Sequence, residues 1–224
     1  MKRLKNILPA LFVAFVAAVS LTSCLGDDGF SNGISPELEM KYRMTMSGNY
    51  RGKVFFKNNE ITDSNNKSKI DSLLYKEADF KYADSTVVLQ SIPAKLFFKA
   101  IDYDNLKEAA EAYGDVDVRL KYEIYGGEDG ATDYLLSVKP ITLTLEYDGA
   151  KHDLLIAFMT NTRGYYRNNK MFFQFIEAAI YDGKDEKGKW KLLEDGGELY
   201  KQGLENTDPD KFKNLIFEFS GSRI

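Results

Sequence analysis

The most constraining feature of this sequence is a stretch of strict two-residue alternation between Val116 and Ile124. Apolar side chains occupy every second position there, and charged ones fill the positions between them: Asp117, Arg119, Lys121 and Glu123. Successive side chains of a strand point to opposite faces of a sheet. The stretch is therefore predicted to be a strand with one buried face and one face in water.

The same alternation returns at residues 141–147, where Asp148-Gly149 follows and a second β-prone stretch covers residues 151–159. An Asp-Gly pair between two such stretches predicts a hairpin with a tight turn. The first strands are expected between Met40 and Lys57, because Tyr42, Met44 and Met46 alternate with polar residues. The polar residues 161–170 are expected to form a loop. Further strands are predicted at 70–82, 85–92, 134–138, 171–181, 189–193 and 215–220.

One helix is expected to interrupt this series of strands. Leu106, Ala109 and Ala110 have helical spacing, Asp104 is a candidate N-cap, and Gly114 follows the last periodic position. The apolar residues 94–101 before it are expected to add a helical turn. The chain contains 15 Phe and 14 Tyr, which favour β structure. The predicted fold is all-β: an antiparallel β-sandwich or β-barrel of about nine or ten strands with one inserted α-helix.

The first 24 residues have the pattern of an export signal. A basic start is followed by an apolar stretch from Ile7 to Ser20, shorter than the roughly 20 residues that span a bilayer. Leu21-Thr22-Ser23-Cys24 resembles the bacterial lipobox. This resemblance implies cleavage before Cys24, acylation of that cysteine, and anchoring to the cell envelope as an outer membrane lipoprotein. An ordinary signal peptide with a chance cysteine is the alternative, but Cys24 is the only cysteine in the chain.

Three segments are therefore expected: a signal peptide at 1–23, a lipidated cysteine with a flexible tether at 24–39, and a single β-rich domain at 40–224. The tether contains Asp27-Asp28, which resembles the acidic cluster that follows the lipidated cysteine in surface-exported lipoproteins of the Bacteroides type. Two aspartates that keep a linker solvated are the alternative. Removal of the leader would leave 27 basic against 34 acidic residues. That balance argues against a nucleic-acid partner, which would call for a basic domain.

The sequence offers few residues for catalysis or for metal and cofactor binding. His152 is the only histidine. Its neighbour Asp153 cannot pair with it within a strand, because adjacent side chains point to opposite faces. Metal sites built from His or Cys are excluded by number. We expect no catalytic residues, no metal site, no cofactor and no enzymatic activity.

A small set of aromatic and basic residues are the candidates for ligand binding. Tyr165, Tyr166 and Trp190 could stack on a sugar ring, with Arg163 and Arg167 as hydrogen-bond donors. Tyr and Arg are also common in protein interfaces. Packing within the core or at an edge is the alternative for each of them.

Three short segments resemble a family of Bacteroides-type lipoproteins known only as a domain of unknown function: residues 48–56, 69–73 and 92–96. The family provides no catalytic residues to carry over. The Gly48-Asn49-Tyr50-Arg51-Gly52 entry is also similar to the first strand of calycin-like barrels, although the helix at 104–113 departs from the lipocalin order of elements. The two glycines predict a bend or a close backbone approach.

These observations favour a membrane-anchored, non-enzymatic binding module for a glycan, a small ligand or a protein partner. The first alternative is a structural or assembly protein of the envelope. The second is a hydrolase that acts on glycans with carboxylates alone.

Overall fold

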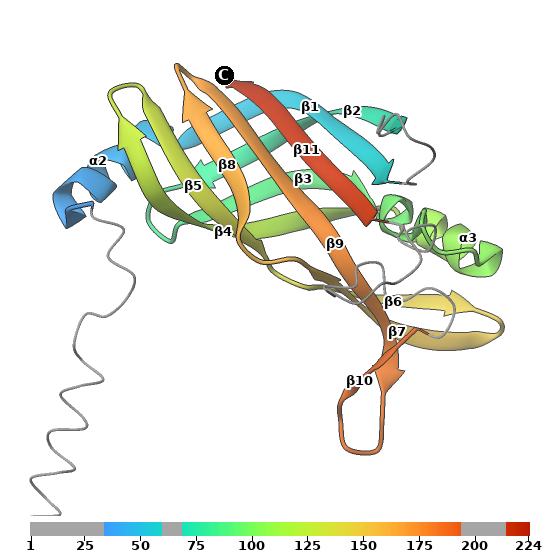
Figure 1. Cartoon of the computed structure of the whole chain (residues 1–224). Coiled ribbons are helices and arrows are strands. Elements are labelled where there is room, and N and C mark those ends of the chain that lie inside the picture. Colours follow the sequence, from blue (N-terminus) through green and yellow to red (C-terminus); the bar gives the residue numbers. More distant parts are fainter. Residues whose placement is uncertain (1–33, 60–68, 194–213) are drawn as a thin grey trace, which may run out of the picture. The chain divides into compact units, whose positions relative to one another are not determined.

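The computed structural model describes residues 34–59, 69–193 and 214–224 (Figure 1). The predicted leader and Cys24 lie outside the described residues. The chain divides into two units, Met1–Ile34 and Ser35–Ile224, and all described helices and strands belong to the second. Among the described residues, no helix is long and apolar enough to cross a membrane.

The second unit is built on a closed barrel of eight antiparallel strands (Figure 1). Each strand pairs with the next, and the last, β11, pairs with both β1 and β9. This closure decides between the two expected architectures in favour of the barrel, which leaves none of its own strands as an open edge. The strands, in their order around the barrel, are β1 (Gly48–Asn59), β2 (Lys69–Lys81), β3 (Thr86–Pro93), β4 (Asp115–Glu128), β5 (Ala131–Val138), β8 (Thr162–Arg167), β9 (Lys170–Lys184) and β11 (Asn214–Arg223).

A smaller sheet branches from the barrel through β9, the longest strand. Its first half pairs with β8 and β11, and its second half pairs with β7 (Ala150–Phe158) and β10 (Trp190–Leu192). A register shift between Ala157 and Phe158, opposite Ala179 and Glu177, marks the branch point. The hairpin partner of β7 is β6 (Ile141–Tyr147), which completes this side sheet. With these three additions the described part of the chain contains 11 strands, slightly more than the nine or ten predicted.

Aromatic side chains fill the barrel. Phe175 and Phe217 stack with ring centres 4.7 Å apart and planes 3° apart, and Phe173 stacks on Phe219 at 5.0 Å. All four rings have no measurable exposure to solvent. Such pairs add about 0.5–1.5 kcal/mol each beyond the area they bury. In each pair one ring comes from β9 and the other from β11, so the two stacks hold these two barrel strands together.

The tight turn and the inserted helix confirm two predictions from sequence. Tyr147 pairs with Ala150, and both turn residues, Asp148 and Gly149, have positive φ, as a type I′ hairpin requires. Helix α3 (Asp104–Tyr113) lies between β3 and β4, after the 3₁₀ turn η1 (Ala94–Phe98). Asp104 is the first helical residue and not the cap: Tyr103 takes the cap position, and its side chain makes no capping hydrogen bond to the helix.

Residues 36–46 correct the prediction of a first strand and shorten the predicted tether. They form helix α2 (Pro36–Met46), which the domain boundary at residue 40 would have divided. Ser35 caps this helix by accepting a hydrogen bond from the Leu38 amide at 3.3 Å, and Pro36 occupies its first turn. Tyr42 and Met46 are buried and lie one helical turn apart, whereas Met44 is 61% exposed. The spacing of four residues between Tyr42 and Met46 therefore belongs to one face of a helix, although it also fits the alternation of a strand.

Residues 161–170 correct a second prediction, because they form a strand and a turn where a loop was expected. Strand β8 pairs with β5 on one side and with β9 on the other. Gly164 is required there, since a Cβ atom would lie 2.3 Å from the Tyr134 ring. Asn168 and Asn169 then make the turn with φ of 48° and 64°.

Candidate functional site

The five residues predicted to bind a ligand do not form one site. Arg163, Tyr165 and Arg167 lie on the outer face of β8, and Tyr165 is 43% exposed. Tyr166 points the opposite way and is buried, with its hydroxyl donating to Asn169 Oδ1 at 3.0 Å. Trp190 lies on β10, at the far end of β9 from β8 (Figure 1).

The residues on the outer face of β8 are engaged with one another. Tyr165 stacks on Phe172 with ring centres 4.9 Å apart. The Arg167 guanidinium lies 5.5 Å from the Tyr165 ring centre and donates to Asp133 at 2.7 Å. None of Arg163, Tyr165 and Arg167 lines either of the two cavities described next. The outer face of β8 is thus an exposed aromatic and ionic stripe that contributes to neither of these two cavities.

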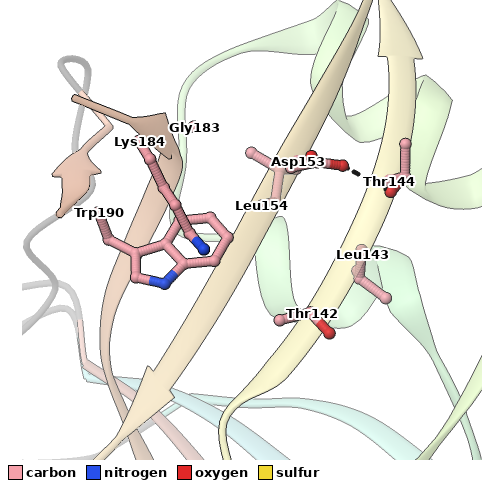
Figure 2. A pocket seen from close by; sticks show the side chains of 8 residues that line it. All are labelled: Thr142, Leu143, Thr144, Asp153, Leu154, Gly183, Lys184 and Trp190. Atoms are coloured by element: carbon pink, nitrogen blue, oxygen red, sulfur yellow. Dashed lines mark hydrogen bonds between the residues drawn. The ribbon is translucent and has the colours of Figure 1, made fainter. Parts of the chain in front are cut away.

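Trp190 instead lines a groove in the side sheet, with a volume of about 430 Å³ (Figure 2). Strand β6 and strand β7 supply one wall, and the hairpin of β9 and β10 supplies the other. We call this feature the Trp190 groove and define it by its lining residues: Thr142, Leu143, Thr144, Asp153, Leu154, Gly183, Lys184 and Trp190.

The aromatic wall of the Trp190 groove carries a positive charge. Trp190 pairs with Lys184 across the hairpin, and the Lys184 ammonium lies 5.0 Å from the centre of the indole ring. A cation over an indole face is attracted by the negative potential of the ring. Figure 2 shows the Lys184 side chain lying alongside the half-buried indole.

The opposite wall is polar. Thr144 and Asp153 are register partners, and the Thr144 hydroxyl donates to Asp153 Oδ1 at 2.7 Å. Thr142 lies two residues along β6, so it shares the exposed face of that strand. The wall therefore offers two hydroxyls and one carboxylate to a ligand.

The hairpin that presents Trp190 is fixed by its own turn. The Asp185 carboxylate accepts hydrogen bonds from the amides of Lys187 and Lys189 at 2.9 Å and 2.8 Å. Gly183 and Gly188 both have positive φ, where a side chain would be strained. The position of Trp190 thus depends on backbone geometry and not on burial alone.

A second cavity, of about 300 Å³, contains the only histidine. His152 Nδ1 lies 2.9 Å from Asp182 Oδ2, and the Tyr147 hydroxyl donates to the same oxygen at 3.0 Å. The imidazole also stacks on Tyr147 at 3.8 Å. Because a carboxylate can only accept, Nδ1 carries the proton in this pair. Burial, together with the hydrogen bond to Asp182, raises the pKa of Tyr147 well above its usual value.

This histidine–carboxylate pair was missed in the sequence. Asp153 faces Thr144 on the exposed side of the hairpin, as the alternation of a strand requires, so it does not contact His152. The true partner comes from β9, which reaches β7 through the pairing of Leu154 with Asp182. No local pattern indicates that pairing. Tyr103 and Asn105 donate to Asp148 and join the start of α3 to the same hairpin.

Glu177 is the most unusual ionisable residue among those described. It is completely buried at the branch point of β9, and neither carboxylate oxygen has a hydrogen-bond partner. Burial raises the pKa of its carboxyl well above the ordinary value, so the buried group carries its proton.

The fold and the groove together define a class: a closed eight-stranded antiparallel barrel with a side sheet that presents an aromatic and polar groove. Residues 45–181 match the family model described as Domain of unknown function (DUF4840), and the chain belongs to this family. The match confirms the expected relationship to a domain of unknown function. It ends before Lys184 and Trp190. No curated protein and no solved structure matches the chain.

Proposed function

We propose that this protein is a membrane-anchored cell-envelope lipoprotein and a non-enzymatic binding module whose ligand is a glycan. The observation that carries the proposal is the Trp190 groove, in which an indole faces two hydroxyls and a carboxylate. Ligand sites are concave and combine apolar walls with a few placed polar groups. This groove has both.

The chemistry of the groove suits a sugar. The C–H faces of a pyranose ring are apolar and pack against a flat aromatic ring, and the indole of Trp190 supplies one. The sugar hydroxyls both donate and accept. Asp153 can accept from them, Lys184 can donate to them, and Thr142 and Thr144 can do either.

The proposed anchor rests on the sequence of residues 21–24. Acylation of Cys24 with two or more chains would make attachment to the outer membrane stable, because each buried CH₂ contributes about 0.8 kcal/mol. A Bacteroides-type origin belongs to the same proposal. So does a calycin-like relationship, which rests on the Gly48–Gly52 entry strand and agrees with the eight-stranded closure.

Hydrolysis by carboxylates is the less favoured alternative. The usual mechanism needs two carboxyl groups about 5–9.5 Å apart across the glycosidic bond. Asp153 is the one carboxylate among the described residues that line the groove, and its Oδ1 already accepts from Thr144. This arrangement favours binding over cleavage.

A role in envelope assembly is the other alternative, and one feature favours it. Strand β6 has β7 as its one neighbour in the described sheet, so its other edge can accept a strand from a partner. Its exposed side chains include Thr142, Thr144 and Glu146, which make this edge polar.

The test of the proposed function is a screen of the purified mature protein against a panel of polysaccharides. We expect at least one of them to raise the melting temperature while no reducing ends are released over hours. Release of sugar product would overturn the binding interpretation in favour of hydrolysis. If no polysaccharide shifts the melting temperature, glycan binding itself is wrong.

A further inference from the structure

We infer that the glycan bound in the Trp190 groove is acidic, and that its anionic group contacts the ammonium of Lys184. This inference rests on the proposed function and specifies its ligand class. It comes from the net charge of the hairpin that carries Trp190 and from the placement of Lys184 and Asp153 on opposite walls.

The hairpin that carries Trp190 is locally basic in an acidic protein. Between residues 184 and 191 it contains four lysines and two acids, whereas the whole chain has a net charge of −4. Among the described residues, no salt bridge involves any of these four lysines: Lys184, Lys187, Lys189 and Lys191. Asp185, one of the two acids, accepts hydrogen bonds from two amides of the turn.

Lys184 is the member of this group that lines the groove. Its ammonium lies over the Trp190 ring, an arrangement that positions the charge without neutralising it. An ammonium group has three N–H donors, and the π face of a ring is a weaker hydrogen-bond acceptor for them than an oxygen atom. An anionic group on the ligand would therefore give Lys184 a counter-ion that none of the described residues provides.

Asp153 on the opposite wall fixes the direction in which such a ligand binds. The Thr144 hydroxyl donates to this carboxylate, which lies across the groove from Lys184. An anionic substituent near Asp153 would be repelled, whereas neutral sugar hydroxyls can donate to it. The ligand is thus oriented with its charge toward Lys184 and its hydroxyls toward Asp153.

Two classes of acidic sugar carry a negative substituent on the ring: uronic acids, which have a carboxylate, and sulfated sugars, which have a sulfate ester. Both are compatible with Lys184, which is a point charge and does not require the planar geometry that an arginine would favour. The experiment therefore compares three sugars: one with a carboxylate, one with a sulfate and one without charge.

Trp190 is the only tryptophan in the chain, so its fluorescence reports on this groove alone. We would titrate the mature protein with methyl glucuronide, methyl glucoside and methyl glucoside 6-sulfate. A charge-assisted hydrogen bond predicts roughly tenfold tighter binding of the anionic sugars than of the neutral one. Added salt should reduce this preference. A difference between the two anionic arms assigns the anion as carboxylate or sulfate.

The variant that tests the inference is Lys184→Gln, which should abolish the preference, so that the two anionic sugars bind no more tightly than methyl glucoside. Lys170→Gln, at the barrel end of the same strand, is the matched control and should keep the preference. Calorimetric titration of both variants removes any dependence on a changed tryptophan signal. Equal affinity for charged and neutral sugars in the unmodified protein would overturn the inference while leaving the proposed function standing. Lack of binding by all three sugars would also overturn the inference, and the polysaccharide screen then decides whether the proposed function stands.

Discussion

His152 and Asp182 are 30 residues apart in the sequence, yet their side chains lie 2.9 Å apart across the neighbouring strands β7 and β9. Asp182 also accepts a hydrogen bond from Tyr147, whose ring stacks on the imidazole. The Asp182 carboxylate therefore contacts both other members of this cluster, His152 and Tyr147. Because β7 and β9 are the central strands of the side sheet, the cluster stabilises the part of the structure that carries the Trp190 groove.

The first prediction concerns Asp182→Ala, which removes the acceptor of both Tyr147 and His152. Loss of a partner for part-buried polar groups costs about 1–3 kcal/mol, and urea unfolding measures the change. Asp153→Ala is the control, because Asp153 accepts only from exposed Thr144, and we expect a loss below about 0.5 kcal/mol there. Equal losses in the two variants would contradict the role assigned to Asp182.

The single histidine gives this cluster a direct spectroscopic test. With ¹⁵N-labelled histidine, we expect the folded protein to show one imidazole that is protonated at Nδ1, because Asp182 can only accept. In Asp182→Ala this preference should disappear. A proton on Nε2 in the unmodified neutral imidazole would contradict the observed pairing.

The second prediction concerns Glu177→Leu and the pH dependence of stability. In the unfolded chain the carboxyl titrates near 4.5, whereas in the barrel its pKa is raised by burial. The contribution of Glu177 to stability is therefore most favourable below pH 4.5 and declines as pH rises toward its folded-state pKa, by up to about 1.4 kcal/mol per pH unit.

Glu177→Leu should remove this decline and make the protein more stable at pH 7 by on the order of 1–3 kcal/mol. Glu146→Gln, an exposed acid on β6, is the control and should leave the pH profile unchanged. Chemical unfolding between pH 4 and pH 8 is the measurement. A Leu variant that is less stable than the unmodified protein at pH 7 would mean that Glu177 has a binding partner in the folded protein.

The third prediction concerns the seam that closes the barrel. A Cβ atom on Gly52 would lie 2.1 Å from the backbone oxygen of Ser220 and 2.3 Å from Gly221 Cα. Backbone atoms cannot yield as a flexible side chain can, so Gly52→Ala should cost at least about 1–3 kcal/mol. Gly126→Ala is the matched control, because nothing lies within 4 Å of its Cβ position. Similar melting temperatures for the two variants would contradict this closure of β1 on β11.

The sequence predicted the strands and turns whose signals are local. Val116–Ile124 alternates on its own, and Asp148-Gly149 defines its turn without help from the rest of the chain. The close approach at Gly52 was also expected from the two glycines around Tyr50. These features depend on neighbours in sequence, and for that reason they could be predicted.

The errors in the sequence prediction have identifiable physical causes. Tyr42 and Met46 fit both a strand and a helix, and the cap at Ser35 with Pro36 after it was the signal for the helix. Strand β8 was obscured by the arginines on its outer face. Gly164 suggested a turn, whereas it makes room for the ring of Tyr134.

The candidate site was only partly predictable. Trp190 was identified from its residue type, and Lys184 joins it across a local hairpin. Asp153 and Thr144 join it only through the pairing of β7 with β9, which lie far apart in the sequence. The separation of Tyr165 from Tyr166 follows from strand alternation once β8 is recognised. Sequence can therefore nominate a residue for a site, whereas the barrel closure and the branch at β9 decide which others accompany it.

The fourth prediction concerns the anchor. Mass spectrometry of the protein from its native host should find an N-terminal peptide that begins at Cys24 and carries acyl chains. Cys24→Ser should move the protein from the membrane fraction to the soluble fraction, because the lipid chains provide the attachment. An unacylated Cys24 behind an uncleaved leader would contradict the proposed localisation.

The central claim is that Trp190, and not the aromatic stripe on β8, forms the glycan site. The most direct measurement is calorimetric titration of a polysaccharide that binds the unmodified protein, carried out with Trp190→Ala and with Tyr165→Ala. Stacking of a nucleic-acid base on an aromatic side chain is worth about 1–3 kcal/mol. A comparable loss for a sugar ring means that Trp190→Ala should weaken binding by roughly 5- to 150-fold, while Tyr165→Ala leaves it unchanged. Full binding by Trp190→Ala, with loss in Tyr165→Ala, would contradict the account and move the site to the outer face of β8.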